Sequence, residues 1–141
     1  MSPRADDVAD DAKLMPLDEP RPVSAEELAL LAALVEAVGS EALSEQVARA
    51  EVVSVCSCGC PSVGLRSDGP ALPSDVVRQL SDVGRDDAFA LSAWGVNDEG
   101  RDVEVTLHVV LGRLEELEVW AGWDGGEVQT ALPAAETLRP T

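Results

Sequence analysis

The sequence has few aromatic side chains and few positive charges. It contains no tyrosine, one phenylalanine and three tryptophans in 141 residues, so aliphatic side chains have to fill most of the core. Acidic residues outnumber basic residues by 27 to 10, which gives a formal net charge of −17 at pH 7. Because this negative field repels nucleic-acid phosphates and anionic lipids, we expect no binding to nucleic acids or membranes. The same field favours a basic protein partner.

The sequence also lacks a long apolar run and a secretory signal. No uninterrupted apolar stretch approaches the ~20 residues of a membrane-spanning helix. Near the amino terminus stand Asp6, Asp7, Asp10 and Asp11, where a signal peptide needs positive charge followed by apolar residues. We therefore expect a cytoplasmic protein whose three cysteines are reduced thiols.

The length and the 45% apolar content fit one globular domain. Residues 1–23 are rich in aspartate and are broken by prolines, which predicts a disordered acidic arm. Residues 24–132 are predicted to form a single α+β domain, and residues 133–141 a tail at the carboxyl end.

Two helices are predicted after the arm. Ser24 and Glu27 have the spacing of a capping box, and Ser40 can cap a second helix after a natural stop at Gly39. The apolar positions at helical spacing are Leu28, Leu31, Val35 and Val38, then Leu43, Val47 and Ala50. We expect an α+β fold in which this N-terminal helical hairpin packs on an antiparallel sheet of about four to five strands.

The last two predicted strands raise a question of register. Gly112 and Arg113 have the order of a two-residue hairpin turn, but a strict two-residue loop there would pair Leu107 with Glu118. That pairing would set a carboxylate against the core. A three-residue loop or a bulge pairs Leu107 with Leu117 instead, and we expect this alternative.

The cysteines are the most distinctive feature of the chain. Cys56, Cys58 and Cys60 occupy every second position, so an extended strand through Cys60 would direct all three thiols to one face. With His108, the single histidine, they match the donor count of a Cys3His zinc site. Structural zinc sites more often separate their cysteines by two to four residues, and the alternative is that the thiols are small apolar groups of the core.

Enzymatic activity is not expected from this sequence. A nucleophilic cysteine needs a stabilised thiolate, and Arg66 is the only basic residue near the cysteines. The sequence also lacks the motifs of serine hydrolases, phosphate-binding loops and zinc proteases. His108 lies on the polar face of its strand, where Glu104 and, across the hairpin, Glu116 or Glu118 could pair with it. A paired imidazolium could act as a general acid, but an ordinary exposed histidine of a sheet is the commoner case.

Two segments resemble a protein family. Residues 55–65, with their Cys-x-Cys-Gly-Cys-Pro pattern, and residues 111–119, with Gly-x-Leu-x-x-Leu-Glu, are similar to small actinobacterial proteins of uncharacterised function. The resemblance covers about residues 28–123. It implies a small, cytoplasmic bacterial domain and carries no function.

We therefore weigh two hypotheses for the function. The favoured one is a small, acidic, non-enzymatic binding protein of the inhibitor or immunity type, without a cofactor, whose surface of Glu104, Glu116 and Glu118 faces a basic partner. The alternative is a metal-binding domain that holds zinc through Cys56, Cys58 and Cys60.

Overall fold

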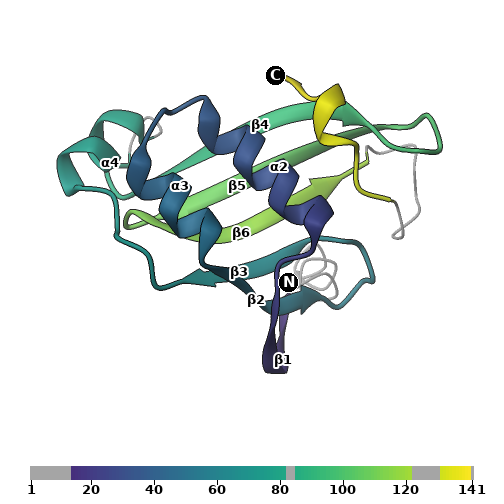
Figure 1. Ribbon diagram of the computed structural model, residues 1–141, viewed down its shortest axis with the longest axis horizontal. Helices are drawn as coiled ribbons and strands as arrows, with labels where there is room; N and C mark the ends of the chain where they lie inside the picture. The colour runs from purple at the N-terminus through teal and green to yellow at the C-terminus, as the bar shows by residue number, and fades with distance from the viewer. Residues whose placement is uncertain (1–13, 82–84, 122–130, 141) are drawn as a thin grey trace, which may run out of the picture.

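A computed structural model describes residues 14–81, 85–121 and 131–140. These residues form one antiparallel sheet of seven strands in the order β1-β2-β3-β6-β5-β4-β7, and helices α2 and α3 cross one face of it (Figure 1). The strands are β1 (Leu14–Pro22), β2 (Ala50–Cys56), β3 (Val63–Ser67), β4 (Ala88–Val96), β5 (Asp102–Val110), β6 (Arg113–Trp120) and β7 (Arg139–Pro140). The helices are α2 (Ala25–Glu36), α3 (Glu41–Ala48), α4 (Ser74–Leu80) and the 3-10 turn η1 (Ala135–Thr137). No helix within the described ranges is long and apolar enough to cross a membrane.

Both predicted helix starts are confirmed. The Ser24 hydroxyl accepts from the Glu27 amide at 3.1 Å, and the Glu27 carboxylate accepts from the Ser24 amide at 2.9 Å. The Ser40 hydroxyl accepts from the Leu43 amide at 3.2 Å. These bonds satisfy amides that the first turn of each helix leaves without an intrahelical acceptor, so the two helices begin at the residues that the capping signals indicate.

The core lies between the helices and the face of the sheet that they cover. Alternation along β5 places Val103, Val105, Leu107 and Val109 on this face, and all four are fully buried. Helix α2 adds Leu30 and Leu31 from one side of its surface. Because aliphatic side chains supply this packing, the scarcity of aromatic residues leaves the core intact.

The predicted N-terminal helical hairpin on a sheet of about four to five strands is wrong. The sheet has seven strands, and α2 and α3 follow a strand instead of opening the fold. Helix α2 packs against β4 and β5, whereas α3 packs against β6, so each covers a different part of the sheet. Local helix signals carry no information about such distant contacts, which explains why the arrangement was missed.

The two additional strands come from segments that were predicted to be an arm and a tail. Within the predicted arm, Leu14–Pro22 form β1 on one edge of the sheet; residues 1–13 lie outside the described residues. Within the predicted tail, Arg139–Pro140 form β7 on the other edge. An edge strand needs hydrogen bonds on one side only, so it tolerates the prolines that suggested disorder.

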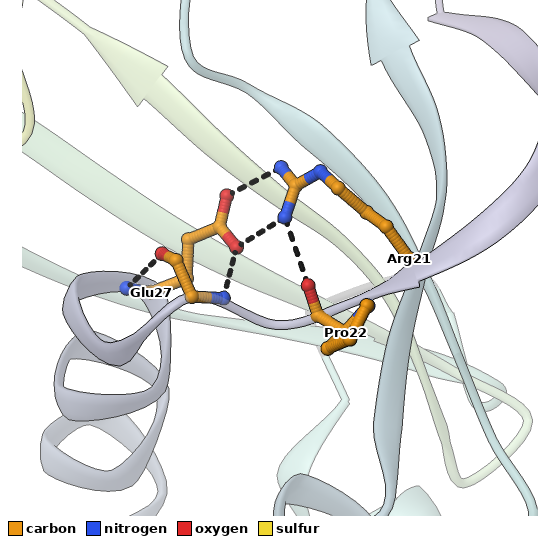
Figure 2. A network of polar contacts seen from close by, with 4 residues as sticks. Arg21, Pro22 and Glu27 are labelled. Carbon is orange, nitrogen blue, oxygen red and sulfur yellow. Dashed lines mark hydrogen bonds and ion pairs between the residues drawn. The ribbon is translucent and has the colours of Figure 1, made fainter.

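An ion pair connects β1 to the start of α2. The Arg21 guanidinium donates to both carboxylate oxygens of Glu27, at 3.1 and 3.0 Å, and also to the Pro22 carbonyl at 3.0 Å (Figure 2). Glu27 is buried, and the same carboxylate accepts the Ser24 amide of the capping box. One carboxylate therefore fixes both the helix start and the position of the edge strand.

The register predicted for the last hairpin is confirmed. A register shift between His108 and Val109 is the expected bulge, and it keeps the apolar faces of β5 and β6 together. The expected apolar pairs are Val105 with Val119 and Leu107 with Leu117. The outer faces of these strands consequently carry the polar residues, among them His108, Glu116 and Glu118.

Candidate metal centre

A turn brings the three cysteines together. Strand β2 ends at Cys56, and the Gly59 amide then donates to the Cys56 carbonyl at 3.2 Å. Gly59 has a φ of 92°, which a glycine adopts at little cost. The chain therefore does not stay extended through Cys60, and the turn, rather than alternation along a strand, brings the thiols together. The ligand sulfur atoms of Cys56, Cys58 and Cys60 lie within 4.8 Å of one another.

Short contacts order the thiols within this turn. The sulfur atoms of Cys56 and Cys58 are 3.0 Å apart, and the Cys60 amide donates to the Cys58 sulfur at 3.4 Å. The Cys60 thiol donates to the Ser62 hydroxyl at 3.4 Å. That hydroxyl accepts from the Val119 amide of β6 at 2.8 Å, so the cysteine turn is attached to the neighbouring strand.

The cysteines of the close pair ionise unequally. Burial is the main cause that raises the pKa of Cys56 to about 12, and its hydrogen bond to Cys58 acts in the same direction. Burial also opposes ionisation of Cys58, but hydrogen bonds from the Cys56 thiol and the Cys60 amide outweigh it and lower the pKa of Cys58. Cys58 is therefore the thiol of this pair that loses its proton first.

The thiols open into a small pocket of about 160 Å³. Strand β6 contributes two carboxylates, and β1 contributes one apolar side chain. The lining residues are Leu14, Cys56, Cys58, Cys60, Ser62, Glu116, Glu118 and Val119. The pocket thus combines three soft sulfur donors with hard oxygen donors from a different strand.

Strand pairing explains why a thiol of β2 and a carboxylate of β6 share this pocket. Val55 pairs with Val63, and Val63 pairs with Leu117, which is fully buried beneath the helices. Because side chains alternate across a strand, the next residues, Cys56 and Glu118, point to the opposite face of the sheet. The site therefore lies on the face of the sheet opposite to α2 and α3. Figure 1 shows the face that the two helices cover.

Gly64 of β3 occupies a crowded position beside the pocket. Gly64 pairs with Ser54 on one side and with Glu116 on the other. A Cβ atom at Gly64 would collide with the Ser54 hydroxyl and would contact Leu14 at 3.4 Å. A side chain at this position therefore fits only if the Ser54 side chain moves, although the backbone angle of Gly64 itself is ordinary.

The two carboxylates of the pocket have different electrostatic surroundings. The Glu118 carboxylate accepts a hydrogen bond from Nε2 of His108 at 2.8 Å, and this bond lowers the pKa of Glu118. Burial raises the pKa of Glu116. Glu118 is therefore the more readily ionised of the two and the better candidate for binding a cation.

The structure places the predicted site residues in three positions. The cysteines lie together, but His108 belongs neither to their ligand group nor to the pocket lining, and it contacts Glu118 instead. Glu116 and Glu118 line the cysteine pocket, whereas Glu104 lies outside it in register with Trp120. The interaction surface predicted for these three glutamates stays a prediction.

Sequence reasoning missed the participation of Ser62 and the pocket position of Glu118. The alternation along β6 already placed Glu118 on the outer face, but nothing local indicated that β6 pairs with β3. Comparisons with protein-family models, curated proteins and solved structures found no match to this chain, and the resemblance to actinobacterial proteins stays a prediction.

Proposed function

We propose that this protein binds a thiophilic metal ion, with zinc the best fit, through the thiolates of Cys56, Cys58 and Cys60. The main support is that the sulfur atoms of these three cysteines lie within 4.8 Å of one another at one pocket. The proposed fourth ligand is the Glu118 carboxylate, which lines the same pocket but lies outside the group of three sulfur atoms, and His108 orients it through a hydrogen bond.

The spacing of the sulfur atoms supports zinc. Zinc–sulfur bonds of about 2.3 Å in a tetrahedral site separate neighbouring sulfur atoms by about 3.8 Å. The three sulfur atoms here span 3.0 Å to at most 4.8 Å, so small side-chain rotations reach that geometry. Thiolates also select zinc over calcium and magnesium, which prefer oxygen ligands.

The proposed role of the metal is structural. Four protein ligands leave no open position on a tetrahedral ion, which is the arrangement of structural rather than catalytic zinc. The ligands come from the end of β2, the turn after it and β6, and Leu14 of β1 lines the same pocket. A bound ion would therefore join segments that are distant in the sequence, and its binding energy would add to the stability of the fold.

Replacing a thiol tests this proposal. Cys58→Ser should abolish zinc retention and lower the melting temperature of the zinc-loaded protein, because metal affinity in a structural site is folding free energy. Zinc content is measured by mass spectrometry of protein purified without chelator, and melting by calorimetry. Ser57→Ala, which changes the exposed residue between two of the cysteines, is the matched control and should keep both properties. Equal zinc content in both variants would refute the thiolate site.

Replacing the carboxylate tests the fourth ligand. Glu118→Gln should weaken zinc affinity by about tenfold or more, because it replaces the anionic donor that His108 orients with a neutral amide. Glu104→Gln alters a carboxylate on the neighbouring strand outside the pocket and should leave affinity unchanged. Affinity is measured by competition with a chromophoric chelator. If Glu118→Gln binds zinc as tightly as the wild type, another group completes the site.

A further inference from the structure

The close pair of thiols has a geometry suited to a reaction as well as to binding. The Cys56 and Cys58 sulfur atoms are 3.0 Å apart, because the turn closed by Gly59 folds the two side chains toward each other. A disulfide needs a separation of about 2.0 Å, which small torsional changes can provide. We propose that Cys58 attacks low-molecular-weight disulfides and that Cys56 resolves the product, which leaves a Cys56–Cys58 disulfide.

The hydrogen bonds of the turn assign the two roles. The Cys56 and Cys58 sulfur atoms share a hydrogen bond of 3.0 Å in which either can donate, but the Cys60 amide donates to the Cys58 sulfur at 3.4 Å, and this contact favours the thiolate at Cys58. The carboxylates of Glu116 and Glu118 line the same pocket and oppose that charge.

The exchange proceeds in two balanced steps. The Cys58 thiolate attacks one sulfur of the small disulfide, so a mixed disulfide forms on Cys58 and one small thiolate leaves. Cys56 then attacks the Cys58 sulfur and expels the second small thiol, while the Cys56 proton passes to the departing thiolate. The protein loses two electrons, and these reduce one small disulfide to two thiols.

Cys60 is held outside this exchange. Its thiol donates to the Ser62 hydroxyl, and Ser62 is buried and bonded to the Val119 amide. The inference goes beyond the proposed metal binding, because it is a reaction of the metal-free thiols. It also connects the two, since a Cys56–Cys58 disulfide removes two of the three thiolates and the oxidised protein would no longer hold zinc.

The test uses the full-length protein, freed of metal by dialysis against a chelator and treated with oxidised glutathione. Trypsin cleaves after Arg49 and Arg66, so one peptide, residues 50–66, contains all three cysteines. After alkylation, mass spectrometry should find Cys60 alkylated and the other two joined. Two outcomes would overturn the proposal: alkylation of Cys56 or Cys58 after complete oxidation, or glutathione that stays attached to the peptide. Neither outcome would bear on zinc binding.

Variants separate the two roles. In the Cys56→Ser variant the reaction should stop at the mixed disulfide, with glutathione attached to Cys58. The Cys58→Ser variant should react with oxidised glutathione at least about tenfold more slowly than the wild type. Cys60→Ser is the matched control and should form the disulfide at the wild-type rate. A Cys58→Ser protein that reacts at the wild-type rate would remove Cys58 from the attacking role. Because the wild-type peptide alone locates the disulfide, the test remains decisive if a variant fails to fold.

Discussion

At the scale of single residues, the ion pair of Arg21 and Glu27 stabilises two elements at once, the edge strand β1 and the start of helix α2. The Glu27 side chain is 6% exposed and accepts from both Arg21 and the Ser24 amide. Burial opposes the charge on Glu27, but the hydrogen bonds from Arg21 and Ser24 outweigh it and lower the pKa of Glu27. A lowered folded-state pKa stabilises the fold above the ordinary carboxyl pKa, and the contribution disappears as the pH falls through the folded-state value.

Arg21→Gln should therefore destabilise the protein by about 1–2 kcal/mol at neutral pH, because it leaves a buried carboxylate without its charged partner. The loss should shrink as acid protonates Glu27. The free energy of unfolding is measured by urea denaturation at several pH values. Arg66→Gln is the control, since it breaks the exposed pair of Arg66 and Glu51 and should cost no more than about 0.5 kcal/mol. A loss for Arg21→Gln that does not change with pH would contradict the electrostatic explanation.

At the scale of elements, the β5–β6 hairpin shows what local pattern can and cannot determine. The alternation of apolar residues fixed the faces of both strands and therefore the need for a bulge. The turn was misplaced by one residue: Val110 pairs with Arg113, so the turn consists of Leu111 and Gly112. Both have positive φ, 54° and 81°, as in a type I′ turn, and leucine is a poor residue for that conformation.

Leu111→Asn should consequently stabilise the protein by about 1 kcal/mol, because asparagine tolerates the left-handed conformation that this turn requires. Leu111 is 71% exposed, so its side chain contributes little packing. Leu111→Ala is the control: it removes the same exposed apolar group but retains the strain, and it should give no comparable gain. Thermal and urea unfolding of the two variants measure the difference. Equal stabilities would show that backbone strain at the turn is unimportant.

At the scale of the whole molecule, the helix starts and the cysteine cluster could be predicted because their signals are local. Capping residues act within one turn, and three cysteines within five positions remain close in almost any conformation. The pairing of Val63 with Leu117 could not be predicted, since it joins distant segments that carry no matching local signal. That pairing places Glu118 beside the thiols, so the composition of the site depended on the fold.

The overall charge leaves a second proposal to be tested. The net charge of −17 favours a basic partner, but two of the three glutamates chosen for its surface line the cysteine pocket. A carboxylate that binds zinc is not available to a partner protein. The two hypotheses from the sequence therefore compete for Glu118, and the ligands of the bound metal distinguish between them.

The X-ray absorption spectrum of the zinc-loaded, full-length protein tests the central claim most directly. A zinc ion held by Cys56, Cys58, Cys60 and Glu118 should show three sulfur ligands at about 2.3 Å and one oxygen ligand at about 2.0–2.2 Å. The spectrum of Glu118→Gln should retain the sulfur shell, because the thiolates remain. A zinc ion surrounded only by oxygen and nitrogen, or by four sulfur atoms drawn from two chains, would contradict the site proposed for this fold.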